Sequence, residues 1–236
     1  MNKSTIRYLT AGWIGAMGCA SMGQAVQASE PEPAPQITVY VFNLAQIEPN
    51  TLRKAKEVAA HIFRNAGVEA TLLDAPPPSA EGQSKELPRP RQSRFFVQIL
   101  SLPMAESFGF PTQVLGVAPG TAQELNRDRV YLFEHVAEEM AWKRRLVLPN
   151  GVDIPNARKG QIMGHGIAHE IGHILLHQAS HSPAGLMRAR WERKDMQNMV
   201  TGDLLFTQGE AERVRAEIIR RTTKLTALEA VRSRQE

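Results

Sequence analysis

The feature that most constrains this chain is a row of histidines spaced four residues apart. Five of the seven histidines belong to it, namely His165, His169, His173, His177 and His181. Positions four apart on an α-helix advance by about 400°, so they lie one turn above each other on one face. Glu170 follows the second histidine and completes the pattern H-E-x-x-H. This spacing predicts a helix that presents two imidazoles and a carboxylate side by side.

The pattern H-E-x-x-H is suited to holding a zinc ion next to a general base. His169 and His173 can reach one ion, and Glu170 is then free to act on a water bound to that ion. We expect the helix to span about residues 157–178 and to be packed against a core. Its apolar residues stand at helical spacing: Ile162, Ile167, Ile171, Ile174, Leu175 and Leu176. The alternative is a buried helix whose histidines only bond to nearby carbonyls.

A catalytic zinc site usually has three protein ligands and a water, and three residues can supply the third ligand. His177 stands about 12 Å along the helix axis from His169, too far for both to converge with the histidine between them. His181 follows the expected helix end, so a chain that turns back there brings it under the metal. Glu192 requires a second helix returning antiparallel to the first. We favour His181, and three neutral imidazoles make Zn²⁺ the expected ion.

The remaining histidines are expected to have supporting or structural roles. His165 and His177 each stand one turn outside the H-E-x-x-H pair, so we expect them to support or border the site without binding metal. His61 and His135 lie in other segments, and we interpret both as ordinary structural or surface residues. Tyr131 is a candidate for stabilising the oxyanion of the reaction, with packing inside the sheet as the alternative.

The sequence around and after the motif resembles that of the metzincin zinc peptidases, with the His-Ser pair closest to the matrixins. The residues concerned are His169, Glu170, His173, His181, Ser182, Gly185, Leu186 and Met187. The resemblance implies the metal ligands His169, His173 and His181. It also implies that Glu170 is the general base and that Met187 lies in a tight turn beneath the metal.

The spacing to the third histidine differs from the common pattern of that clan. The pattern H-E-x-x-H-x-x-G-x-x-H would place glycine at Leu176 and histidine at Ala179, whereas His181 comes two residues later. A second resemblance concerns Glu192, which follows His173 at a spacing similar to that in the gluzincin aminopeptidases. That resemblance implies Glu192 as the third ligand, and it is kept as the alternative site.

The order of expected elements indicates a layered α/β (α+β) domain. Strands are expected at 37–42, 68–73, 94–100, 114–117 and 130–133, and helices at about 51–65, 157–178 and 208–230. A further helix is expected after the strand at 130–133, running through Glu138, Glu139 and Trp142. The unit of strand, helix and strand at the start favours a parallel pair. The metzincin resemblance implies a mixed twisted sheet, an active-site helix and a C-terminal helix. Residues 113–119 are the candidate edge strand for an extended substrate, with a plain loop as the alternative.

Three parts are expected along the chain. Residues 1–28 form a signal peptide, with Lys3 and Arg7 before a short apolar stretch and a cleavage site after Ala28. Residues 29–36 form a proline-rich linker. Residues 37–236 form one zinc-peptidase domain, with an upper part at about 37–178 and a lower part at 179–236 containing the methionine turn.

The N-terminal segment predicts export to the periplasm or the extracellular space, because its apolar run is too short for a membrane span. Cys19 is the only cysteine and lies inside that run, so a lipid anchor there is the alternative. The net charge of +4 includes six arginines near the C-terminus with no aromatic residues among them, so we expect no nucleic-acid partner.

Together these observations predict an exported zinc-dependent metallopeptidase, which hydrolyses peptide bonds with a zinc-bound water activated by Glu170. Its partner is a peptide or protein substrate. Two alternatives stay open at this point. One is an aminopeptidase-like zinc hydrolase that uses Glu192, and the other is a non-catalytic zinc-binding protein of the cell envelope.

Overall fold

The computed structural model describes residues 33–76, 93–119, 128–143 and 155–232. The helices and strands of these described ranges all belong to the unit Ala34–Glu236. The expected signal peptide, Cys19 and most of the expected linker lie outside the described residues. None of the helices in the described ranges is both long and apolar enough to cross a membrane.

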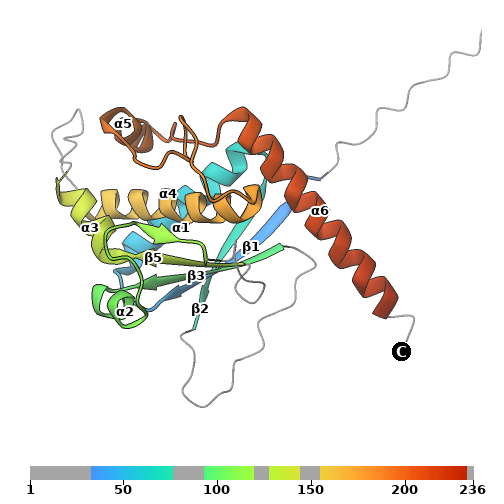
Figure 1. The fold of residues 1–236 in the computed structure, drawn as a ribbon, viewed down its shortest axis with the longest axis horizontal. Coiled ribbons are helices and arrows are strands. Elements are labelled where there is room, and N and C mark those ends of the chain that lie inside the picture. Colours follow the sequence, from blue (N-terminus) through green and yellow to red (C-terminus); the bar gives the residue numbers. More distant parts are fainter. Residues whose placement is uncertain (1–32, 77–92, 120–127, 144–154, 233–236) are drawn as a thin grey trace, which may run out of the picture. The chain divides into compact units, whose positions relative to one another are not determined.

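A five-stranded mixed sheet forms the centre of the fold (Figure 1). The strand order is β2-β1-β3-β5-β4, in which four strands are parallel and β4 runs antiparallel to β5 at one edge. The expected parallel pair is therefore confirmed, with Val39 of β1 opposite Leu72 of β2. The strands are β1 (Gln36–Asn43), β2 (Glu69–Ala75), β3 (Ser93–Leu100), β4 (Gly116–Val117) and β5 (Arg129–Phe133).

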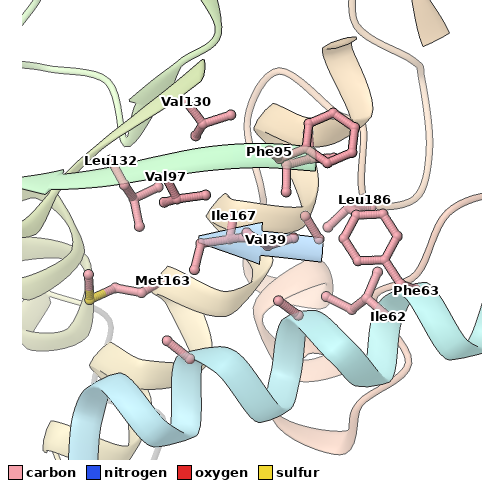
Figure 2. Close-up of a cluster of buried hydrophobic side chains, with 14 of the residues drawn as sticks. Val39, Ile62, Phe63, Phe95, Val97, Val130, Leu132, Met163, Ile167 and Leu186 are labelled. Atoms are coloured by element: carbon pink, nitrogen blue, oxygen red, sulfur yellow. The ribbon is translucent and has the colours of Figure 1, made fainter. Parts of the chain in front are cut away.

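Six helices accompany the sheet in the described part of the chain. They are α1 (Pro49–Asn65), α2 (Leu102–Ser107), α3 (Glu134–Lys143), α4 (Pro155–Leu176), α5 (Arg193–Thr201) and α6 (Gln208–Arg232). The main core lies between the sheet and helices α1 and α4 (Figure 2). There Ile62 and Phe63 of α1 and Ile167 of α4 face Val39 and Val97 of the strands, all of them at most 1% exposed. The coarse α/β class expected from the periodicity is confirmed.

Helix α4 carries glycines because neighbouring elements approach it closely. A Cβ atom on Gly164 would lie 2.6 Å from the Ala55 carbonyl oxygen of α1. A Cβ atom on Gly166 would lie 2.8 Å from Leu132 Cδ1 of β5. Real Cβ atoms essentially never make such contacts, so these positions require glycine for the packing of α1 and the sheet against α4. Glycine has a low helix propensity, so the close packing of α4 against α1 and the sheet lowers the intrinsic stability of the helix.

Two short helices were not expected from the sequence. Helix α2 begins after Ser101, whose position before a Pro at the helix start favours helix initiation. Helix α5 begins with a reciprocal capping box between Glu192 and Asp195 and ends at Gly202, which has φ of 86°. Both had local signals, but at six and nine residues each is too short to be marked as a helix in the sequence.

Candidate metal centre

The C-terminal half of α4 presents the expected histidine pair on a buried face. His169 and His173 are each 8% exposed, and their Nε2 atoms lie 3.1 Å apart. His181 comes from the segment after the helix, and one ligand atom from each of the three histidines lies within 4.8 Å of the other two. The structure therefore brings His169, His173 and His181 together into a group that could hold a metal ion.

The chain reaches His181 by a turn directly after α4 ends at Leu176. His177 has φ of 50°, the left-handed conformation that usually favours glycine at a helix end. The turn therefore lies one residue after the position where the metzincin pattern has its glycine. After it, the His181 ring centroid lies 5.3 Å from that of His169 and 4.8 Å from that of His173.

In His169 and His173, hydrogen bonds to backbone carbonyls determine which ring nitrogen is free to bind a metal ion. Nδ1 of His169 lies 2.9 Å from the Leu186 oxygen, and Nδ1 of His173 lies 2.7 Å from the Gln178 oxygen. A carbonyl only accepts hydrogen bonds, so each Nδ1 carries the hydrogen. Each Nε2 is then unprotonated and has a lone pair available, which is the state required of a metal-binding imidazole.

Two lone pairs facing each other are unfavourable unless a cation or a proton lies between them. Burial lowers the pKa of His169 to about 4 and also lowers the pKa of His173, so protonation of either ring is disfavoured near neutral pH. A tetrahedral ion with Zn–N distances of about 2.0 Å has ligand nitrogens about 3.3 Å apart. The observed 3.1 Å between the two Nε2 atoms matches that spacing. The residues present therefore fit a bound metal ion.

Glu170 lies on α4 beside the histidines and is 7% exposed. No hydrogen bond or ion pair from the described residues reaches its carboxyl group. Burial raises the pKa of Glu170 to about 8, because the charged carboxylate loses hydration there. A cation held by the neighbouring histidines would favour the ionised form and offset part of that rise.

The three histidines and Glu170 lie on a cleft of about 740 Å³. One wall is the segment 113–119, which includes the edge strand β4. The segment 188–191 lines another part of the cleft, as do Val136 and Met140 of α3. The edge strand expected at 114–117 is present but shorter, with bounds Gly116–Val117. The histidine group is thus open to a space large enough for an extended ligand.

The turn after His181 supports the site from below. Ser182 donates its backbone N–H to the Met187 oxygen at 2.8 Å, which closes the turn. A Cβ atom on Gly172 would lie 2.7 Å from Met187 Sδ, so the methionine packs directly against α4 beside His173.

Trp191 has a role in the site that the sequence did not indicate. Its indole N–H donates to the Leu186 oxygen at 3.0 Å, the same oxygen that accepts the hydrogen bond from His169. The Trp191 ring lies edge-on to His169, with centroids 5.7 Å apart. Only the presence of a tryptophan soon after the methionine turn could have suggested this contact.

Glu192 is not among the grouped metal-binding residues. Its side chain is 64% exposed, pairs with Arg188 at 3.3 Å and caps the start of α5. Glu192 stands just before the first residue of α5, Arg193, so its side chain is used at the helix start and is not carried on a helix facing the histidines. This arrangement disfavours Glu192 as the third ligand.

The other histidines and Tyr131 are accounted for by packing and local contacts. His165 is 1% exposed and bonds through Nδ1 to Gln161 of its own helix. Its ring also lies edge-on to Trp191, with centroids 6.2 Å apart, and Trp191 in turn lies edge-on to His169. His165 therefore borders the site through Trp191 and is not one of the three grouped histidines. His61 contacts the Gly202 oxygen and His135 the Thr112 oxygen, both structural contacts as expected. Tyr131 packs in the sheet against Phe110, with ring centroids 4.6 Å apart.

Comparisons with known proteins do not add to the assignment. No model of a known protein family matches the chain, and no curated protein matches it in sequence at a significant level. The function of this chain must therefore be inferred from the site itself.

Proposed function

We propose that this chain is an exported zinc-dependent metallopeptidase of the metzincin type. The observation that carries the proposal is the convergence of His169, His173 and His181 beside Glu170 on an open cleft. A structural zinc site is closed by its ligands, whereas a catalytic one keeps a position for water and substrate. His181 is exposed and the cleft continues past it, which favours the catalytic kind.

The order of elements around the site supports the metzincin type. A mixed sheet with an antiparallel edge strand precedes the helix that carries H-E-x-x-H. A turn then supplies the third histidine, Met187 packs beneath the site, and a long C-terminal helix closes the fold. The basic residues and short apolar run at the N-terminus support export.

The residues of the cleft have separate tasks in the proposed reaction. Zn²⁺, when bound by the three histidines, polarises a carbonyl and lowers the pKa of water towards about 7. The Glu170 carboxylate accepts a proton from the attacking water and passes it to the nitrogen of the leaving amine. Its pKa, raised by burial, keeps it a stronger base than an ordinary carboxylate. Strand β4 offers its free edge to the backbone of an extended peptide.

The test compares Glu170→Gln with the wild type for zinc content and for peptide hydrolysis. We expect about one zinc ion per chain in both proteins and nearly complete loss of turnover in the variant. Glu106→Gln on α2, outside the cleft, is the matched control and should keep full turnover. Retained turnover in Glu170→Gln would refute the mechanism. Bound zinc without hydrolysis of any peptide would instead favour a non-catalytic zinc-binding protein.

A further inference from the structure

Three charged residues on one face of α6 contact the segment that carries the third histidine. Glu210, Arg213 and Glu217 stand at helical spacing along α6, which crosses near the end of α4 (Figure 1). Each has one partner in the segment 177–182. Ser182 Oγ donates to Glu210, Arg213 Nη1 donates to Gln178 Oε1 at 3.3 Å, and His177 Nε2 lies 2.9 Å from Glu217 Oε1. The face made by Glu210, Arg213 and Glu217 is called the α6 polar face below.

His177 needs such support because its backbone is in the left-handed region. Its φ is 50°, a conformation that costs free energy for any residue with a Cβ atom. Glu217 is 8% exposed and is itself held by Arg220 and Arg221 at 2.7 Å. Arg221 also pairs with Asp128 at 2.7 Å, which fixes it from outside the helix. The partner of His177 is thus a rigid, buried carboxylate.

The residue after His177 connects this turn to a metal-binding histidine. The backbone N–H of Gln178 donates to the His173 oxygen at 3.2 Å. The Gln178 oxygen accepts the hydrogen bond from His173 Nδ1 at 2.7 Å. A shift of the turn would therefore move the group that orients His173, and it would also move His181 three residues later. Partners that orient metal ligands in this way typically change metal affinity by about 10-fold to 100-fold when they are lost.

We propose that the α6 polar face positions the metal-binding histidines, with Glu217 and Arg213 as positioning residues that act through His177 and Gln178. The inference rests on the metal site of the proposed function, but it does not require that the protein hydrolyse peptides. It assigns to the C-terminal helix a part in metal affinity, although no residue of α6 lines the cleft.

The first test measures the Zn²⁺ dissociation constant of the full chain by competition with a chelator. Glu217→Gln keeps the shape of the side chain and removes its charge, and we expect zinc binding weaker by about 10-fold or more. Glu212→Gln is the matched control, because Glu212 is exposed on the same helix and bonds only to Gln208 among the described residues. The absorption spectrum of the Co²⁺-loaded protein should change in Glu217→Gln and stay unchanged in Glu212→Gln.

A second variant separates positioning from general loss of stability. Glycine adopts the left-handed conformation without a steric cost, so the His177→Gly chain should still fold. The substitution also removes the contact with Glu217, so zinc binding should weaken by a similar factor. In that background, Glu217→Gln should cause little further loss, because the two residues act through one contact. The proposal would be overturned if the losses of zinc affinity in the two single variants multiplied in the double variant. An unchanged dissociation constant in either single variant would also overturn it.

The outcomes also separate this proposal from the proposed function. A wild type that binds no zinc would overturn both. Zinc binding without peptide hydrolysis would overturn only the peptidase function. Equal zinc binding by the wild type and Glu217→Gln would overturn only the positioning role of α6, even if the variant unfolds at a lower temperature.

Discussion

Gly116 of β4 provides a sharp test of how the edge strand and the proposed general base fit together. A Cβ atom at this position would lie 2.9 Å from Glu170 Cγ and 2.9 Å from the Tyr131 carbonyl oxygen. Ordinary contacts begin at 3.4 Å, so Gly116→Ala requires a displacement of about 0.5 Å. The Tyr131 oxygen belongs to the backbone of β5, so Glu170 or the edge strand must move.

Such overpacking costs about 1–3 kcal/mol of folding free energy. A displacement of a catalytic group by about 1 Å can cost about 100-fold in rate, so we expect kcat/KM of Gly116→Ala to fall by about 10-fold to 100-fold. Zinc content should stay the same, because the three histidines are untouched. The assay is steady-state hydrolysis of a fluorogenic peptide. Gly209→Ala is the control, because no atom beyond its chain neighbours and its own helix backbone lies within 4 Å of the added methyl group. Wild-type kcat/KM in Gly116→Ala would refute the packing argument.

Three further outcomes are expected. His181→Ala should lose zinc or bind it far more weakly while Glu192→Ala keeps it, as measured by metal content after dialysis; the reverse result would move the third ligand to Glu192. Gly172→Ala should destabilise the fold by about 1–3 kcal/mol in denaturant unfolding, because its Cβ would lie 2.7 Å from Met187 Sδ; an unchanged midpoint would contradict the close packing. Burial alone would raise the pKa of Glu217, but hydrogen bonds from its arginine and histidine partners lower it to about 2. Its stabilising contribution is therefore present above about pH 4.5 and lost as the pH falls towards 2, so the acid sensitivity of unfolding should be smaller in Glu217→Gln.

Local periodicity was sufficient to predict most of the fold. The strand at 37–42 and the helix at about 51–65 were placed within two residues of their observed ends, because each has a clear apolar pattern. The histidine pair of α4 was predictable for the same reason, since spacing along one helix determines which side chains share a face. His181 could be preferred to Glu192 because local sequence signals predict that the helix ends before His181, which lets the chain turn back there.

The features that the sequence did not reveal depend on contacts between distant segments. The pairing of His177 with Glu217 joins residues 40 positions apart, and the contact of Gly116 with Glu170 joins an edge strand to a helix. The left-handed turn at His177 was also unexpected, because glycine is the usual residue for it. No local pattern encodes such contacts, since they arise only when the sheet and helices are packed together.

The contact between Trp191 and His169 provides a way to follow metal binding by intrinsic tryptophan fluorescence. The chain has three tryptophans, of which Trp142 is 54% exposed and Trp13 lies in the expected signal peptide. Trp191 is 7% exposed and stands edge-on to His169, so we expect its fluorescence to respond when that imidazole binds a metal ion. In a Trp142→Phe protein without the signal peptide, the emission would come from Trp191 alone. Titrating such a protein with Zn²⁺ would report occupancy of the site directly, without a substrate.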